Sequence, residues 1–312
     1  MPLSFADRTR KNILSKRLRR FFDLNTDLGQ SQDIECFADP DTSLLRLVSS
    51  VNIPCCVHDG DPVAVMHAIE LAKRFNCSVS AHIGYPDPAS QGYQSFADRV
   101  EREPQWLSAW ILLQVGAMQA MLKTYGLPLE SVRPHGALYW DLVTQPHVGQ
   151  VVAQTLAKID RWLFLVGPAC NALEQLAESA NIRVAPEVVL GKRYFGNGPF
   201  MGLPMLISND AGTGNSADPD LTPTAALEQA KLLIRQNMIS THDGHSVPVK
   251  ALTLHITPRA KSAIGIAERV VAMLGQPVPL SATAVGTSGW LEVTEPPVET
   301  RPWLEGGAED YL

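Results

Sequence analysis

The chain has 312 residues, of which 45% are hydrophobic and 19% are charged. This composition supplies enough apolar side chains for a core, and it excludes a mainly disordered, collagen-like or coiled-coil chain. The formal net charge of −6 gives no support to general nucleic-acid binding, which is usually accompanied by a basic excess.

Strand and helix patterns alternate along the first half of the chain. Strands are predicted over 20–25, 48–55 and 77–82, and a helix with Asp61 as its N-cap and Pro62 at its first position lies between the last two. A long helix follows and contains residues 104–122, none of which is charged. This run has nearly the length of a membrane span, but polar residues interrupt it, which favours a buried helix or an interface between subunits.

The second half continues the alternation. Strands are predicted over 131–134, 162–166, 182–189 and 251–255, helices over 147–159, 171–180, 225–236 and 259–274, and a polar loop over 208–223. About seven strand–helix units indicate an α/β fold with a parallel sheet and helices outside it. We favour a closed or nearly closed barrel, with an open doubly wound sheet as the alternative. GxGxxG after the first strand and GxxxxGK(S/T) are both missing, so nucleotide binding through those motifs is unsupported.

The two ends of the chain differ in charge from the middle. Seven lysines and arginines fall within the first 20 residues, whereas six acidic residues and one arginine follow residue 286. We predict a solvated basic extension over 1–19, with an organelle transit peptide as the alternative, a barrel domain over 20–278, and an acidic, proline-containing extension over 279–312. The five cysteines include an adjacent pair and no CxxC, which is typical of a reduced, cytoplasmic protein.

Histidines gather at the ends of the predicted strands. Four of the eight lie at or just past the carboxyl end of a strand: His58, His82, His135 and His255. Active sites of parallel α/β folds form at these ends, so the four histidines are candidate functional residues. The others have no predicted role: His67, His147, His242 and His245.

Carboxylates accompany the histidines on the first strand. Asp23, Asn25 and Asp27 alternate, so they share one side of the strand, which we expect to face the barrel interior. An interior carboxylate is costly unless it is paired or liganded. Two or three histidines with an aspartate can bind a divalent metal, and Asp23, His58 and His82 are the candidates. Without a metal, the same groups could act as general acid and base. Neither HxxxH nor HExxH is present, so spacing alone supports the metal weakly.

The string RPHGALY, from Arg133 to Tyr139, is the most distinctive in the chain. Pro134 is expected to end a strand, and Gly136 to let the backbone approach another group closely. Arg133 beside a buried histidine suits an anionic substrate group, and a salt bridge in a tight turn is the alternative.

Nucleophilic catalysis has less support. No GxSxG is present. Cys55 and Cys56 lie near His58 and could form a Cys–His pair, but buried, inert cysteines are favoured. Asp61 is predicted equally as a helix cap and as a site carboxylate, and Asp87 supplies a further loop carboxylate.

Several strings together resemble the LamB/YcsF family, whose characterised members are the A subunits of bacterial ATP-dependent 5-oxoprolinases. The family strings DLNxDxGE, ANIACGxHAGDP, GAHPxYPD and KPHGALY correspond to DLNTDLGQ at 23–30, VNIPCCVHDGDP at 51–62, SAHIGYPD at 80–87 and RPHGALY at 133–139. Segments 187–194 and 254–260 are similar to ExFADRxY and VHGDTPGA. The resemblance implies a distorted seven-stranded β/α barrel related to polysaccharide deacetylases.

The resemblance also implies that the chain opens a lactam, hydrolysing 5-oxoproline to glutamate with subunits B and C. The residues predicted to be catalytic in such a reaction are Asp23, Asn25, Asp27, His58, His82 and His135. The residues predicted to bind substrate are Asn52, Asp61, Tyr85, Asp87, Arg133, Tyr139, Glu187, Lys192 and His255. ATP, through the complex, is the cofactor that the resemblance implies, whereas the strand-end histidines and aspartates themselves point to a divalent metal (Zn²⁺, Mn²⁺ or Mg²⁺). No nucleic-acid or membrane partner is expected, and a homo-oligomer stays open.

The chain departs from the family at charged positions. Gln30 replaces an acidic residue, and Gln94 and Ser95 replace a basic pair. Gly191 occupies the position of an aspartate, and Leu203 that of an arginine. Each lost charge is expected to cost several kcal/mol of transition-state stabilisation if it acts there. Two alternatives therefore stay open: a metal-dependent C–N hydrolase with a different, less anionic substrate, and a non-catalytic binding subunit that kept the barrel.

Overall fold

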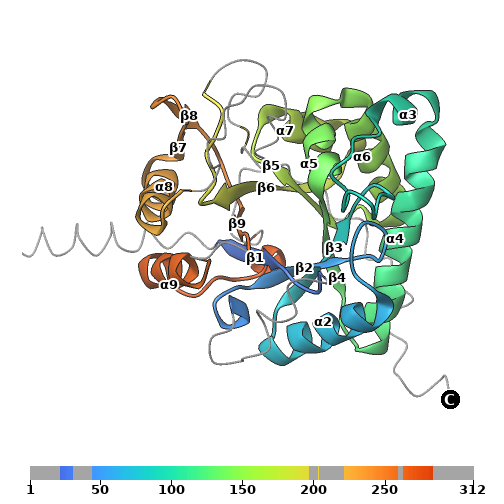
Figure 1. The fold of residues 1–312 in the computed structure, drawn as a ribbon, viewed down its shortest axis with the longest axis horizontal. Helices are drawn as coiled ribbons and strands as arrows, with labels where there is room; N and C mark the ends of the chain where they lie inside the picture. Colours follow the sequence, from blue (N-terminus) through green and yellow to red (C-terminus); the bar gives the residue numbers. More distant parts are fainter. Residues whose placement is uncertain (1–21, 31–43, 197–202, 204–220, 259–262, 284–312) are drawn as a thin grey trace, which may run out of the picture.

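The computed structural model describes residues 22–30, 44–196, 203, 221–258 and 263–283. Seven parallel strands close into a barrel in the order β1-β2-β3-β4-β5-β6-β9 (Figure 1). Their bounds are β1 (Asp23–Asp27), β2 (Ser50–Pro54), β3 (Ser78–Ile83), β4 (Leu129–Pro134), β5 (Phe164–Pro168), β6 (Arg183–Leu190) and β9 (Thr253–Ile256). Because β1 pairs with both β2 and β9, the sheet has no free edge, which confirms the predicted barrel over the open sheet.

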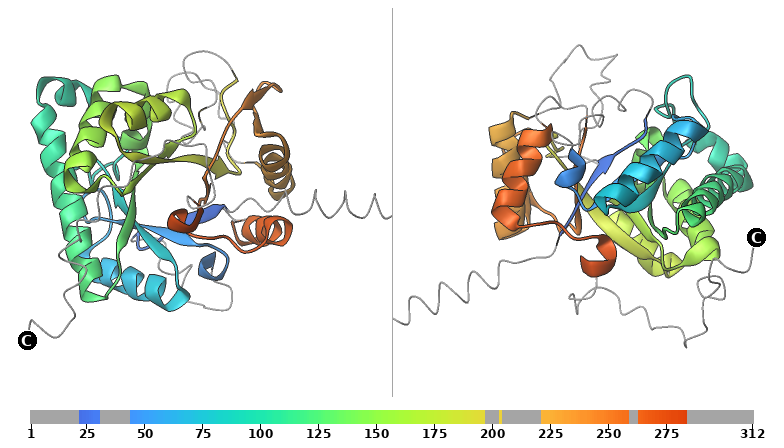
Figure 2. Two further views of the ribbon diagram at one scale, coloured as in Figure 1. Left: turned by 180° about the vertical axis from the view of Figure 1, so that it is seen from behind. Right: turned by 90° about the horizontal axis from the view of Figure 1, so that it is seen from below.

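Helices cover the outside of the barrel (Figure 2). The longer ones are α2 (Pro62–Phe75), α4 (Pro104–Thr124), α6 (Pro146–Asp160), α7 (Asn171–Ala180), α8 (Pro223–Gln236) and α9 (Ala263–Leu274). The shorter ones are η2 (Leu44–Arg46), α3 (Ala97–Arg102), α5 (Gly136–Thr144) and α10 (Leu280–Thr283). An antiparallel pair, β7 (Met238–Ser240) and β8 (Ser246–Pro248), follows α8. In Figure 1, α8, α9 and this pair lie at one end of the molecule, and α3, α4 and α6 at the other.

The elements match the expected alternation, with differences at their ends. The first strand starts at Asp23 and runs to Asp27, so it lies later than predicted, and β4 starts at Leu129. Neither α5 nor the β7–β8 pair was predicted, because both are short and carry weak periodicity. The extension over 1–19, most of the polar loop, the start of the helix predicted from 259 and most of the C-terminal extension lie outside the described residues.

The start of α2 shows how local sequence fixes an element. The Asp61 carboxylate accepts hydrogen bonds from the backbone N–H of Val63 at 2.8 Å and of Ala64 at 3.1 Å, and Pro62 occupies the first turn. The helix ends at Asn76, whose left-handed φ of 57° is a common C-terminal signal. The capping role of Asp61 is confirmed, and it accounts for this residue without a ligand.

The uncharged run forms α4, which packs on the barrel with one face. Its buried residues recur every three or four positions: Leu107, Ile111, Gln114, Val115, Met118 and Leu122. Leu112 and Leu113 are 50% and 57% exposed on the other side. No helix in the described part of the chain is long and apolar enough to cross a membrane.

The two faces of the barrel strands differ in chemistry. Outward-facing Leu24, Ile53, Ile83 and Leu254 belong to the main hydrophobic core between strands and helices. Layers of branched aliphatic side chains usually fill such a barrel. Here the inner faces near the carboxyl ends carry polar side chains instead. Buried polar groups are costly unless they are paired, so most of this interior is expected to form a hydrogen-bonded network.

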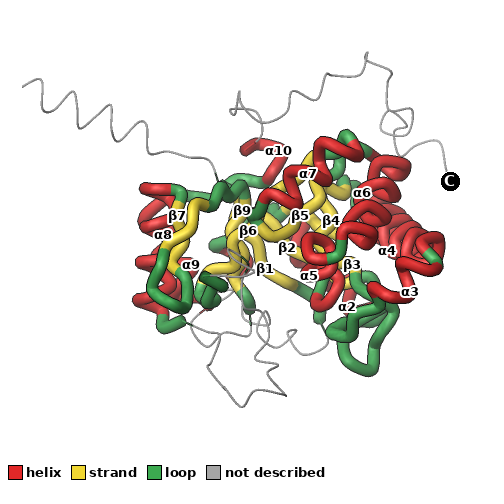
Figure 3. Tube along the Cα trace, turned by 90° about the horizontal axis from the view of Figure 1, so that it is seen from above, coloured by secondary structure: helices red, strands yellow, loops and turns green. Residues whose placement is uncertain are grey.

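The amino end of the barrel is closed by apolar side chains. Phe164, Val166, Ala185 and Leu280 form a second, smaller cluster. The backbone N–H of Ser281 donates to Glu130 Oε1 at 2.7 Å, which ties α10 to the start of β4. Figure 3 shows α10 at the edge of the barrel near β5 and β6. The polar groups are therefore left at the carboxyl end, where the site lies.

Candidate active site

The deepest polar layer surrounds Asp23 on β1. Its carboxylate accepts hydrogen bonds from the hydroxyls of Ser49 at 2.7 Å, Ser50 at 2.7 Å and Thr253 at 2.5 Å. Burial outweighs these hydrogen bonds and raises the pKa of Asp23 to about 6. The carboxylate is thus hydrogen-bonded by three hydroxyls, and Asp23 does not belong to the group of described side chains that could hold a metal, His58, His82 and His135.

The next layer is organised by Asn25, whose side chain joins four neighbours. Its amide N–H groups donate to Thr253 Oγ1 at 2.7 Å and Glu187 Oε2 at 3.1 Å. Its carbonyl oxygen accepts from Asn52 Nδ2 at 2.8 Å and from His255 Nδ1 at 2.7 Å. His255 stands in register with Asn25 on the adjacent strand. Asn25 is thus a structural link between β1, β2, β6 and β9.

Asp27, at the carboxyl end of β1, faces several nitrogen atoms of neighbouring side chains. Its Oδ1 lies 3.0 Å from Asn52 Nδ2, 3.6 Å from Arg133 Nη1 and 3.6 Å from His82 Nε2, and its Oδ2 lies 3.8 Å from His255 Nε2. Burial opposes ionisation, but electrostatic interaction with His82, His255 and Arg133, of which Arg133 is charged at neutral pH, outweighs it and holds the pKa of Asp27 far below its usual range. Asp27 therefore stays an anion at neutral pH.

Arg133 forms a buried ion pair with Glu187 across the barrel. Its Nε lies 2.9 Å and its Nη2 2.8 Å from Glu187 carboxylate oxygens, and Tyr139 donates to the same carboxylate at 2.8 Å. The guanidinium also lies 5.0 Å from the centre of the Tyr139 ring. Burial opposes ionisation of Glu187, but Arg133 overcomes this and lowers its pKa. Arg133 is therefore committed to a salt bridge, the alternative considered for it.

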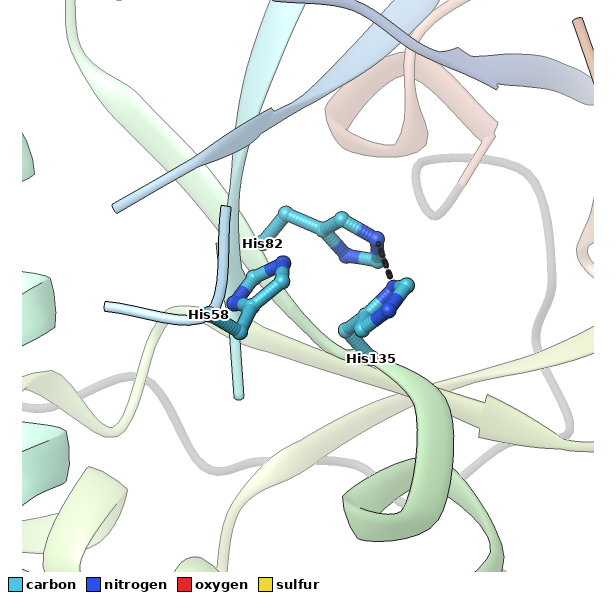
Figure 4. A group of neighbouring side chains, drawn as sticks. All are labelled: His58, His82 and His135. Carbon is cyan, nitrogen blue, oxygen red and sulfur yellow. Dashed lines mark hydrogen bonds between the residues drawn. The ribbon is translucent and has the colours of Figure 1, made fainter. Parts of the chain in front are cut away.

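Three histidines meet above this network (Figure 4). His58 lies in the loop after β2, His82 on β3, and His135 between β4 and α5. One nitrogen of each lies within 4.8 Å of the other two, and His82 Nε2 is 3.0 Å from His135 Nδ1. The rings of His58 and His135 stack with centroids 4.3 Å apart. Burial is the largest cause that lowers the pKa of all three, so they are neutral near pH 7. These are the side chains that could hold a metal.

The turn into α5 places His135. Gly136 has φ 54°, and a Cβ there would lie 2.5 Å from the carbonyl oxygen of Gly92. The backbone N–H of Ala137 donates to that same oxygen at 3.0 Å. Glycine is required by the positive φ and by the close approach of the loop. The expectation of a close backbone approach at Gly136 is confirmed.

Two residues predicted to bind substrate form their hydrogen bonds with groups other than the histidines. Tyr85 is fully buried, donates to Asp141 at 2.8 Å and packs on Phe96. Asp87 accepts hydrogen bonds from the Ser90 side chain and from the Gln94 backbone N–H, so it braces its own loop. Both belong to a loop scaffold, because their polar atoms are already paired there.

The remaining candidates are His255, Lys192 and Cys55. Burial and Arg133 lower the pKa of His255 to about 4, and Lys192 adds a weaker repulsion, which puts Lys192 near the site. Burial raises the pKa of the Cys55 thiol, so a reactive thiolate at that position is disfavoured.

The pairing of Thr253 with Asp23 was not predicted. The sequence did contain a signal that Thr253 faces the barrel interior, because Thr253 and His255 are two residues apart and share one face of β9.

The comparisons with known proteins agree with this fold and these strings. A family model described as the LamB/YcsF family matches residues 22–282. The chain belongs to the LamB/YcsF family. It is 34% identical to the 5-oxoprolinase A subunit from Chloroflexus aggregans over 74% of this chain and 86% of that protein. It is 31% identical to the 5-oxoprolinase A subunit from a strain of Thermus thermophilus over 81% and 96%.

A solved structure of the LamB/YcsF fold is also similar. The lactam utilization protein from Thermus thermophilus superposes with a TM-score of 0.70 at 29% identity. The match covers 83% of this chain and 99% of that one. Two of the predicted departures from the family lie in buried surroundings here, because Gln30 and Leu203 are both 5% exposed.

Proposed function

We propose that this chain hydrolyses the ring amide of 5-oxoproline to give glutamate, in an ATP-dependent assembly with subunits B and C. The proposal is supported by LamB/YcsF membership and by relatives named as the A subunits of 5-oxoprolinases. The match over most of the length of those relatives supports the transfer of the whole activity. ATP enters through the complex.

The observation that carries the proposal is the ionised Asp27 facing neutral histidines at the carboxyl end of a barrel. Hydrolysis adds the oxygen of water to the ring carbonyl carbon, breaks the C–N bond and delivers a proton to the nitrogen. A lactam resists this attack because its amide is resonance-stabilised. The site residues therefore have to position water and take up its proton.

The polar residues divide into two groups by their contacts. Asp27, His58, His82 and His135 face one another, and we assign them to the reacting groups. The rest are assigned to positioning, since their polar atoms contact these four or one another: Asp23, Asn25, Asn52, Arg133, Tyr139, Glu187 and His255. This division predicts large kinetic effects for the first group and mixed stability effects for the second.

The test is ATP-dependent release of glutamate from 5-oxoproline by the purified chain with subunits B and C. We expect turnover by the wild type and a loss of about 100-fold or more in kcat for Asp27→Asn, because the amide removes the negative charge at nearly constant shape. Asp98→Asn, on the exposed face of α3, is the matched control and should keep full activity.

Each outcome of that assay bears on a different part of the proposal. Full turnover by Asp27→Asn would reject the site assignment while leaving the reaction intact. No turnover by a wild-type chain that binds both partners would reject the reaction and would favour a non-catalytic binding subunit.

A second candidate function is favoured by the ion pairs that Arg133 forms. Its guanidinium is engaged by Glu187 and Asp27, so it is poorly placed to hold the carboxylate of 5-oxoproline. A C–N hydrolase for a less anionic cyclic amide fits this arrangement. Parallel assays with 5-oxoproline and 2-pyrrolidinone, the same ring without a carboxylate, separate the two. Higher kcat/KM for 2-pyrrolidinone would support the second function.

A further inference from the structure

Hydrogen bonds to backbone carbonyls fix which ring nitrogen carries the hydrogen in His82 and in His135. His82 Nδ1 lies 3.0 Å from the carbonyl oxygen of Arg133, and His135 Nε2 lies 2.9 Å from the carbonyl oxygen of Gln91. A carbonyl oxygen can only accept, so each of these nitrogens must carry the hydrogen. A neutral imidazole has one N–H, which leaves His82 Nε2 and His135 Nδ1 as bare lone pairs.

Those two bare nitrogens face each other. They lie only 3.0 Å apart, a distance typical of a hydrogen bond, yet neither has a hydrogen to donate. Two lone pairs at this separation repel. The arrangement becomes favourable only when a cation, either a metal ion or an additional proton, is bound by both nitrogens.

His58 adds a third, independent observation. Its ring is 1% exposed, and neither ring nitrogen has a hydrogen-bond partner within the described part of the chain. Leaving a buried polar atom unpaired costs about 1–3 kcal/mol, which calls for an explanation. A Cβ on Gly84 would lie 2.5 Å from His58 Nδ1, so backbone holds this ring closely in place. The unpaired ring is therefore built into the site.

We propose that His58, His82 and His135 form a three-histidine centre for a divalent transition-metal ion, with His82 bound through Nε2 and His135 through Nδ1. Metal-binding histidines usually donate the other ring N–H to a carbonyl or carboxylate, which is the arrangement of His82 and His135. Asp27 Oδ1, 3.6 Å from His82 Nε2, supplies a neighbouring carboxylate.

The ligand type selects among metals. Three imidazole nitrogens suit Zn²⁺, whereas Mg²⁺ prefers oxygen ligands, so Mg²⁺ is the least suitable of the ions expected from the sequence. When bound, such a metal would act as a Lewis acid on a carbonyl oxygen or lower the pKa of water. The binding does not depend on which amide is the substrate, so this inference stands apart from the proposed substrate.

The test measures metal binding by the full chain without any activity assay. The protein is stripped with a chelator, dialysed, loaded with Zn²⁺ or Co²⁺, and analysed by elemental mass spectrometry and visible absorption. We expect about one tightly bound ion per chain and a Co²⁺ spectrum typical of nitrogen ligands. His82→Gln and His135→Gln should each weaken binding at least about 100-fold, since each removes a ligand.

Three histidine variants are the controls. His67→Gln, on the exposed face of α2, and His147→Gln, on α6, should leave the metal content unchanged. His255→Gln removes a buried histidine that lies beside Asp27 but outside the group, so it should also retain the metal. Folding of every variant is checked by circular dichroism.

Two results would overturn the proposal. One is a folded wild-type chain that binds neither Zn²⁺ nor Co²⁺ in stoichiometric amount, which would leave a proton shared between His82 and His135 as the cation. The other is metal binding that survives His82→Gln and His135→Gln. If the variants fail to fold, the Co²⁺ spectrum of the wild type still decides, because a spectrum without nitrogen ligands rejects the centre.

Discussion

At the scale of single residues, the buried pair of Arg133 and Glu187 supports the polar interior. Glu187 also accepts hydrogen bonds from Tyr139 and Asn25, so one carboxylate joins β1, β4, β6 and α5. Arg133 in turn lies 3.6 Å from Asp27. Removing one charge of a buried pair leaves the other uncompensated, which costs more than the pair itself contributes.

We expect Glu187→Gln to lower the free energy of unfolding by about 3–5 kcal/mol, because the buried Arg133 charge would lose its hydrogen-bonded counterion and keep only Asp27, 3.6 Å away. Urea denaturation measures the change. Glu228→Gln is the control, since Glu228 is exposed and pairs with Lys231 at the surface, and it should change stability by less than about 1 kcal/mol. Equal, small effects of the two variants would show that the Arg133–Glu187 pair is not needed for stability.

At the scale of elements, the loop between β3 and α3 and the start of α5 form one unit that positions His135. Asp87 and Ser90 brace the loop, His135 contacts the carbonyl oxygen of Gln91, and Ala137 binds that of Gly92. The loop can come this close because Gly136 has no side chain.

Gly136→Ala should therefore disturb the site as well as the fold. A methyl group would meet the Gly92 carbonyl oxygen and strain the positive φ, so we expect a loss of about 1–3 kcal/mol in stability and a lower kcat. Gly116→Ala on α4 is the opposite case, because nothing lies within 4 Å of the added Cβ. It should stabilise the helix by up to about 1 kcal/mol. Thermal unfolding of both variants checks the sign, and a stabilised Gly136→Ala would contradict the packing described here.

At the scale of the whole molecule, barrel closure buries Asp23 between β1, β2 and β9. The pKa of Asp23 rises from 3.8 to about 6, so the folded protein holds this proton more tightly than the unfolded chain does. Its contribution to stability is therefore fully present below pH 3.8 and is lost as pH rises through about 6. Asp27 and Glu187, whose pKa values are lowered, contribute in the opposite direction.

A comparison of the wild type with Asp23→Asn isolates this effect, since Asp27 and Glu187 are common to both. We expect the stability of the wild type relative to the variant to increase by up to about 3 kcal/mol as pH falls from about 8 to about 4. Urea denaturation across that range measures it, with Asp98→Asn as a variant whose difference should stay constant. A pH-independent difference for Asp23→Asn would contradict the raised pKa.

Part of this structure is predictable from local patterns. Alternating strand and helix periodicity predicted the barrel, because each strand must be covered by the helix that follows it. The Asp61–Pro62 cap located the start of α2, because capping involves only the first turn. The positions of His58, His82 and His135 near strand ends brought them to one end of the barrel, because parallel strands share their carboxyl edge.

The pairing of the polar residues was decided only by the tertiary structure. Arg133 and Glu187 are 54 residues apart, and Asp23 and Thr253 are 230 apart. Their contacts depend on strand register and on closure of β1 against β9, which no local pattern encodes. For that reason the sequence identified Asp23 and Arg133 as polar candidates but assigned Asp23 to a metal, and it left the role of Arg133 open. The bare nitrogens of His82 and His135 likewise follow from backbone carbonyls that only the folded barrel brings to them.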